Sequence, residues 1–300
     1  MLNSRILSLE EAAASIPDKS VITMGGFGVF LQPMAMVREM IRQGKKDISL
    51  LSVGEAYAGD LLIGGGCVKR IALSSFGFEA VTGRARNFCK AVEQGKVEVE
   101  DYSHFSMASR LMAGAMGLPF AAVNSLRGSD LLEKIVYEKK FEKMKSPFSG
   151  EEVILLPSAN PEIAIIQAQR ADSEGNIQVF GPTISIEQQA KASKRVIAIV
   201  EEIVPRSTIQ STPSATLLPS LFVDTLVVLP YSAHPMSSYG YYDYDLEHIY
   251  TYTNASKTPE TWKKYLDEYV YGPSDHFDYL KRIGGLRKIM KLRADPLLGY

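Results

Sequence analysis

The strongest constraint on the fold is an alternation of short apolar segments with helix-like segments over the first 120 residues. Residues 21–24 (VITM), 48–53 (ISLLSV) and 68–74 (VKRIALS) are apolar enough to form buried strands, and residues 97–100 (VEVE) alternate like a fourth strand. Between them, apolar residues recur at helical spacing. Strands that alternate with helices predict an α/β fold, in which helices cover both faces of a mostly parallel sheet.

Local signals place further elements along the chain. A charged stretch, residues 133–152, predicts a surface excursion, and the tyrosine-rich residues 239–252 predict either an interface or a core patch. We expect a single domain over residues 1–300 with a C-terminal helical extension from about residue 239. The other expected elements are a helix from Pro33 to Gly44, helices at 60–66, 79–92, 104–116 and 259–282, a hairpin within 163–180, and strands at 153–156, 195–204 and 222–229.

Composition excludes several classes of protein. The 33 basic and 34 acidic residues leave no basic excess for binding nucleic acid or a membrane surface. No apolar run approaches the ~20 residues of a membrane helix. The N-terminus carries acidic residues and has no apolar core of a signal peptide. Cys67 and Cys89 form no CxxC motif, and the four histidines lack ligand spacing. We therefore expect a cytoplasmic protein without a bound metal.

Four loops should meet where the parallel strands end, because ligands of such sheets bind at the carboxyl edge. They are residues 25–32, 54–59, 75–79 and 101–104. The first contains Gly25, Gly26, Phe27 and Gly28, whose glycines leave little side-chain bulk and so let backbone N–H groups approach a phosphate or an oxyanion near a helix N-terminus. The loop is neither a GxGxxG motif nor a P-loop, so a plain strand-to-helix turn stays open.

Polar side chains in the other loops are candidates for chemistry. His104 follows Ser103 at the start of a predicted helix, whose dipole disfavours the charged imidazole and leaves an N–H donor for a substrate oxygen. The alternative is a surface or capping histidine. Glu55 follows a buried strand and could act as nucleophile or base, or could simply open the next helix. Ser74 and Ser75 could reach a substrate carboxylate or could satisfy loop backbone.

Taken together, these segments resemble family I CoA transferases, and among them the A (alpha) subunits of the glutaconate CoA-transferase group. The resemblance runs through nearly the whole chain in the family's order. The matching segments are VITMGGFGVFLQPMAMVREMI, AGDLLIGGGCVKRIALSSFGFE, VEVEDYSHFSMASRLMAGAMGLPF, SLRGSDLL, QAQRADSEGNIQVFG, VIAIVEEIVPR, VDTLVVLPYSAHP and the tail that begins YYDYDLEHI.

The resemblance implies a three-layer α/β/α fold and a partner beta (B) subunit, often in an A2B2 heterotetramer. It also implies that the glutamate nucleophile lies on the beta subunit, and that acyl-CoA and a carboxylic acid are substrates, with no permanently bound cofactor. His104 falls where relatives place a polar donor to the thioester oxyanion. The glycine loop, Ser74, Ser75 and Ser103 would bind substrate or CoA.

Two other functions stay open at this point. Steroid-ring-cleaving CoA hydrolases share the outline, but they place a glutamate near the position of His104. A non-catalytic ligand-binding protein on a related fold is the third possibility. One departure concerns residues 183–188 (TISIEQ), which lack the acidic residue that the family would place directly after Gly181-Pro182.

Overall fold

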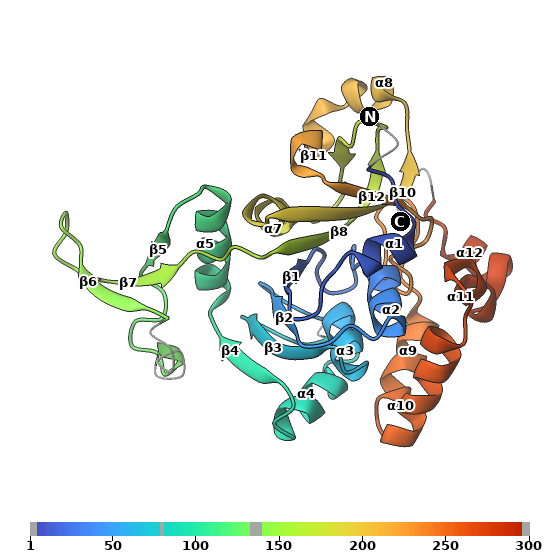
Figure 1. Ribbon diagram of the computed structural model, residues 1–300, viewed down its shortest axis with the longest axis horizontal. Helices are drawn as coiled ribbons and strands as arrows, with labels where there is room; N and C mark the ends of the chain where they lie inside the picture. The colour runs from blue at the N-terminus through green and yellow to red at the C-terminus, as the bar shows by residue number, and fades with distance from the viewer. Residues whose placement is uncertain (1–4, 79–80, 133–139, 296–300) are drawn as a thin grey trace.

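The computed structural model describes residues 5–78, 81–132 and 140–295. Within these residues, nine strands form one large sheet (Figure 1). Its parallel part has the order β12-β10-β8-β1-β2-β3-β4, and β9 and β11 add antiparallel pairs at the end of β8. The strands are β1 (Val21–Met24), β2 (Ile48–Leu51), β3 (Val68–Leu73), β4 (Glu98–Asp101), β8 (Ile163–Ala171), β9 (Ile177–Gln178), β10 (Arg195–Ile203), β11 (Thr216–Leu218) and β12 (Thr225–Val228).

Helices cover both faces of this sheet. Helices α1 to α4 pack in sequence against one another, whereas α5 and α7 contact each other on the opposite side. The α-helices of the described residues are α1 (Leu9–Ala14), α2 (Met34–Arg42), α3 (Tyr57–Gly64), α4 (Arg86–Glu93), α5 (His104–Ala115), α7 (Ile186–Ala192), α8 (Arg206–Ser211), α9 (Leu246–Ala255), α10 (Pro259–Leu266), α11 (His276–Arg282) and α12 (Gly285–Leu292).

The central strand β8 shows why the sheet is buried on both sides. Ile163 and Ile165 point into the core beneath α1 to α4, whereas Ala164 and Ile166 point into the core beneath α7. Successive side chains of a strand face opposite sides, so an unbroken apolar strand needs cover on both. This arrangement confirms the predicted three-layer α/β/α fold with a mostly parallel sheet.

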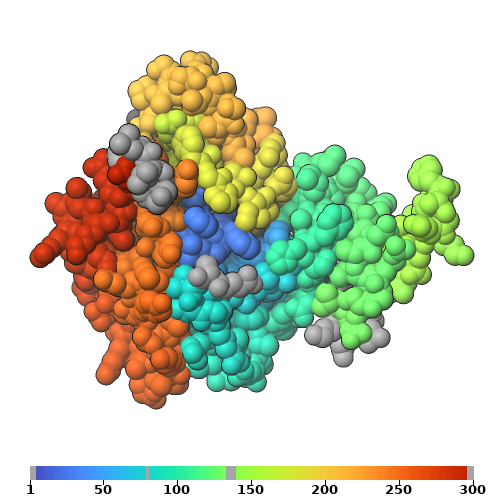
Figure 2. Space-filling view, turned by 180° about the vertical axis from the view of Figure 1, so that it is seen from behind, coloured from blue at the N-terminus to red at the C-terminus, as the bar shows by residue number. Residues whose placement is uncertain are grey.

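A small antiparallel sheet projects from the body as an arm (Figures 1 and 2). It contains β5 (Phe120–Val123), β7 (Glu152–Pro157) and β6 (Glu142–Lys145), in that order. Every residue of β6 is exposed. The predicted surface excursion falls on this arm, except that residues 133–139 lie outside the described residues.

Two predicted helices differ from the structure. The helix expected over residues 79–92 is only α4, and residues 79–80 lie outside the described part. Before α4, Phe78 and Gly83 close a turn, and Gly83 has the left-handed φ of 77° that interrupts a helix. The helix expected over 259–282 is divided: α10 continues into a π-helical turn, Asp267–Tyr271, and α11 begins again at His276, because Pro273 lacks the N–H that a continuous helix needs.

The C-terminal helices pack on the sheet side that holds α2 and α3. Tyr252, Trp262, Tyr265 and Val270 belong to the same hydrophobic core as these helices. Tyr252 is fully buried, so this end of the tyrosine-rich stretch is a core patch. The division into one domain with a C-terminal extension stays a prediction, which limited proteolysis would test.

Candidate active site at the carboxyl edge of the sheet

The predicted loops meet at the carboxyl edge of β1 to β4. The N–H of Glu55, after β2, donates to the carbonyl of Ser75, after β3, over 3.0 Å. The Phe27 ring, after β1, lies so close to Gly54 that a Cβ there would be 2.9 Å from it. His104, after β4, lies near Ser75. In Figure 2 the blue N-terminal part of the chain reaches the surface between the yellow and teal segments.

The glycine loop is a tight turn that folds back on itself. Phe27 and Phe30 exchange two backbone hydrogen bonds of 3.0 and 2.9 Å. Gly26 has a φ of 97°, and a Cβ on it would lie 2.4 Å from the Leu31 carbonyl oxygen, so only glycine fits. Helix α2 begins at Met34, several residues later, so the loop does not lie directly on that helix N-terminus. Its predicted role in binding substrate stays a prediction.

Gln32 is a buried residue at this edge that the sequence reasoning did not single out. Its Nε2 donates to the Gly28 carbonyl, and its Oε1 accepts from the Ala58 N–H; each of these hydrogen bonds is 2.6 Å long. One amide therefore joins the glycine loop to the segment that follows Glu55. A glutamine just after a glycine loop is a weak signal, because its burial and its second partner come from the tertiary fold.

His104 begins helix α5 and is exposed. Its Nε2 lies 3.4 Å from the Ser75 hydroxyl, a separation at the long limit of a weak hydrogen bond. The Ser103 hydroxyl caps the helix by accepting from the Ser106 N–H over 3.1 Å, and the Ser106 hydroxyl accepts from the Ser103 N–H in return. The cap thus fixes the helix start, and the His104 imidazole is open to solvent there.

Glu55 faces inward. Its side chain is buried, and Oε2 accepts from the Gly59 N–H over 3.2 Å at the start of α3. Burial raises the pKa of the Glu55 carboxyl to about 7, against the lowering effect of hydrogen bonds from Ser52 and Gly59. This geometry fits the alternative that Glu55 opens the next helix. The expected role of Glu55 as nucleophile or base stays a prediction.

The two serines after β3 differ. The Ser74 hydroxyl donates to the Val53 carbonyl, as expected if Ser74 hydrogen-bonds the loop backbone and not a substrate carboxylate. The Ser75 hydroxyl instead faces His104 and lies 3.1 Å from where a Gly54 Cβ would be. Of the two, Ser75 is therefore the one whose hydroxyl lines the edge beside the imidazole.

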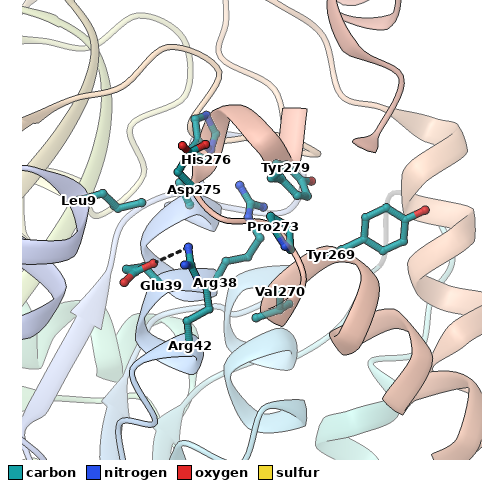
Figure 3. Close-up of a pocket in the computed structure, with 11 residues that line it drawn as sticks. Leu9, Arg38, Glu39, Arg42, Tyr269, Val270, Pro273, Asp275, His276 and Tyr279 are labelled. Atoms are coloured by element: carbon teal, nitrogen blue, oxygen red, sulfur yellow. Dashed lines mark ion pairs between the residues drawn. The ribbon is translucent and has the colours of Figure 1, made fainter. Parts of the chain in front are cut away.

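Other hollows lie apart from these loops. A cavity of about 470 Å³ lies near the ends of β10 and β12, where Glu201, Tyr231, Tyr242 and Arg293 line it. A polar cavity of about 20 Å³ lies between α2 and α11, with Arg38, Glu39 and His276 around it (Figure 3). The second has room for about one water molecule, so it is too small for an acyl-CoA.

The described part of the chain contains no group of three His, Cys, Asp or Glu side chains that could hold a metal ion. Nor does any helix in the described ranges combine the length and apolar character that crossing a bilayer requires. The expectation that no cofactor is bound permanently stays a prediction, with full activity after exhaustive chelation as its test.

Comparisons with known proteins identify the family of this chain. A model of the family described as coenzyme A transferase matches residues 6–229. The A subunit of glutaconate CoA-transferase from Acidaminococcus fermentans is 34% identical over 99% of this chain and 97% of its own length. The crystal structure of glutaconate coenzyme A-transferase from that organism has a TM-score of 0.94 at 33% identity, covering 99% of this chain and 98% of that chain.

Two further matches also cover most of this chain. An uncharacterized protein of Archaeoglobus fulgidus is 36% identical over 96% of this chain, which spans 64% of that protein's length. A variant of the decarboxylase AibA/AibB has a TM-score of 0.78 at 34% identity, covering 87% of this chain and 98% of that chain.

The ring-opening hydrolase alternative is less well supported. The cholesterol ring-cleaving hydrolase IpdA subunit of Rhodococcus jostii is only 25% identical, over 90% of this chain and 93% of its own length. A match to an enzyme family over most of the chain also disfavours a non-catalytic ligand-binding protein. The chain therefore belongs to the coenzyme A transferase family, and within it to the group of A subunits.

Proposed function

We propose that this chain is the A (alpha) subunit of a heteromeric CoA transferase that moves CoA from an acyl-CoA to a carboxylic acid. A beta (B) subunit carries the glutamate nucleophile, in an A2B2 assembly. The observation that carries this proposal is that His104 is exposed at the sheet edge whereas Glu55 faces inward. This chain thus offers a donor at the sheet edge but keeps its own nearby carboxylate away from it. A cytoplasmic setting, where acyl-CoA is available, is part of the same proposal.

The proposed reaction proceeds through three covalent intermediates on the partner's glutamate, namely an anhydride, a thioester and a second anhydride. The partner's glutamate carboxylate attacks the thioester carbonyl and expels CoA thiolate, which leaves an acyl-glutamyl anhydride. The thiolate then attacks the glutamyl carbonyl, releasing the first carboxylate and forming a glutamyl-CoA thioester. The acceptor carboxylate attacks this thioester, expels the thiolate and forms a second anhydride. The thiolate then attacks the acceptor's carbonyl, which gives the new acyl-CoA and releases the free glutamate carboxylate. Each attack turns a carbonyl oxygen into an oxyanion.

This chain contributes to those steps by stabilising charge and by positioning. A His104 N–H aimed at the carbonyl oxygen would strengthen its hydrogen bond as negative charge develops. Ser75 would hold the ring, and the turn around Gly26 would keep backbone close to the substrate. The hydroxyl of Ser103 is already used in the helix cap, so its part is to fix the start of α5.

The chain alone is expected to be catalytically silent. The reason is that the proposed nucleophile lies on the partner. CoA transfer would be assayed with the purified chain, with the B-type subunit of its own organism, and with both co-expressed, on a panel of acids that includes glutaconate. Activity should appear only in the pair, and light scattering should place both chains in one particle. Strong activity of the chain alone that is lost in Glu55→Gln would contradict the proposal.

Gln32→Glu is expected to make activity of the pair depend on pH in a new way. A protonated glutamic acid can donate to the Gly28 carbonyl and accept from the Ala58 N–H, as the amide does. An ionised carboxylate would instead set a negative oxygen against the Gly28 carbonyl. We expect a loss of about tenfold in kcat at pH 8 relative to wild type that shrinks as the pH falls.

The comparison is the ratio of variant to wild-type kcat across pH, with thermal unfolding followed at each pH. Gln32→Leu, which removes both hydrogen bonds, is the matched control and should give a ratio that is independent of pH. An equally flat ratio for Gln32→Glu would show that Gln32 does not position the loop.

A further inference from the structure

An apolar face of the molecule continues directly from the candidate site. A groove of about 360 Å³ runs along the outer side of α5 and the start of β5. Its lining residues include Phe105, Met112, Met116, Leu118 and Phe120, which are 65%, 46%, 66%, 47% and 46% exposed. Large apolar side chains that gather on a surface in this way mark a place where another molecule binds.

The pattern of α5 is that of a helix with two apolar sides. Met107 and Leu111 point into the core and are fully buried. Phe105, Met112 and Met116 lie on the other side, at spacings close to whole helical turns. Strand β5 repeats the arrangement, because Val123 is buried whereas Phe120 is exposed. An exposed side of a helix that carries several large apolar side chains favours a cover by another molecule.

We propose that this face, defined as the α5–β5 face by Phe105, Met112, Met116, Leu118 and Phe120, is where the B subunit docks. The inference rests on the proposed function and names the surface that joins the two chains. Phe105 directly follows His104 in the sequence, so a partner seated on the face would also border the imidazole. Glu55 faces inward, and a B subunit docked on this face could supply the outward-facing nucleophile.

The chemistry of the face favours a protein partner over a small substrate. The groups that react in CoA transfer are carboxylates and thioesters, which are polar. The groove is instead lined by aromatic, aliphatic and methionine side chains with one serine. Methionine and aromatic residues are enriched at the centres of protein interfaces. The face also extends onto β5, which lies at the base of the projecting arm (Figure 1).

The test introduces charge on the face. Met116→Glu and Phe120→Glu would each be purified, and affinity would be measured by titrating the purified B-type partner of the same organism into the chain. Each variant should weaken binding by about tenfold or more, because an apolar interface centre must then bury a carboxylate. Leu286→Glu is the matched control, since Leu286 is 74% exposed on α12 and lies far from α5 (Figure 1). It should bind as wild type does.

The outcomes separate the two proposals. If wild type shows no binding of the B-type partner, the proposed function fails. If wild type binds and both α5–β5 variants bind equally well, the docking surface is elsewhere and this inference fails. If the chain alone is a dimer that the variants turn into monomers while B binding is unchanged, the face is occupied by a second copy, which also overturns the inference. Circular dichroism of each isolated variant shows whether the fold is intact.

Discussion

Replacement of His104 by alanine is expected to reduce kcat of the A–B pair by roughly 10²–10³, which corresponds to about 2.7–4 kcal/mol of transition-state stabilisation. The imidazole is exposed at the start of α5 and near the Ser75 hydroxyl, so its loss should disturb little of the fold. A donor that acts mainly on the developing oxyanion changes kcat more than KM. Steady-state kinetics on the co-expressed pair, with one acyl-CoA and one acceptor acid, would measure both.

His104→Gln distinguishes a donor from a base. The glutamine amide keeps an N–H donor, so a transferase that uses His104 for the oxyanion should retain much more activity with glutamine than with alanine. A hydrolase that uses His104 to deprotonate water would lose as much with glutamine as with alanine. Near wild-type kcat in both variants would mean that His104 is only a surface residue at a helix start.

The fold can be predicted from the sequence where periodicity is strong. The strand at residues 21–24 and the start of the helix at His104 agree with the structure to the residue, because an apolar run or a capping serine marks each boundary. The helix expected over residues 79–92 is too long. The pattern of apolar residues continues through Gly83, but the left-handed φ of Gly83 interrupts the helical backbone. Periodicity records which face a segment would bury and says little about where a helix must stop.

The candidate site can be predicted only in its position. Knowing that parallel strands end at one edge is enough to bring Phe27, Glu55, Ser75 and His104 together. The direction of each side chain is not predictable, because it depends on partners from other elements. The Glu55 carboxyl group turns toward the Gly59 N–H in the helix that follows it. The Gln32 amide, which follows β1, accepts from the Ala58 N–H, which follows β2. Such choices follow from burial, which a single sequence does not report.

A buried carboxylate ties the C-terminal helices to the first half of the chain. Asp60, on α3, is completely buried and accepts from three donors. They are the Tyr252 hydroxyl at 2.6 Å, the Phe88 N–H at 2.8 Å and the Asn87 amide at 2.9 Å. Tyr252 lies on α9, whereas the other two lie at the start of α4. These three neutral donors offset part of the cost of burying the Asp60 carboxyl group.

Asp60→Ala is therefore expected to lower the free energy of unfolding by about 3–5 kcal/mol, because three buried donors lose their acceptor at once. Tyr252→Phe, the matched control, removes one donor and leaves the carboxylate with two, so it should cost only about 1–2 kcal/mol. Urea unfolding followed by circular dichroism would measure both. Losses of equal size in the two variants would show that Asp60 does not organise the cluster.

The loss in Asp60→Ala should also vary with pH in a definite direction. Burial raises the pKa of Asp60 from 3.8 to about 6 in the folded protein, in opposition to its hydrogen bonds. The folded chain then holds a proton that the unfolded chain releases, so wild-type stability from this group falls as the pH rises from about 4 through 6. The alanine variant lacks this titration. The gap between the two proteins should therefore be widest near pH 4 and should narrow above pH 6, by up to about 1.4 kcal/mol per pKa unit. A gap that widens as the pH rises would mean that Asp60 is held as a carboxylate by stabilising bonds that outweigh its burial.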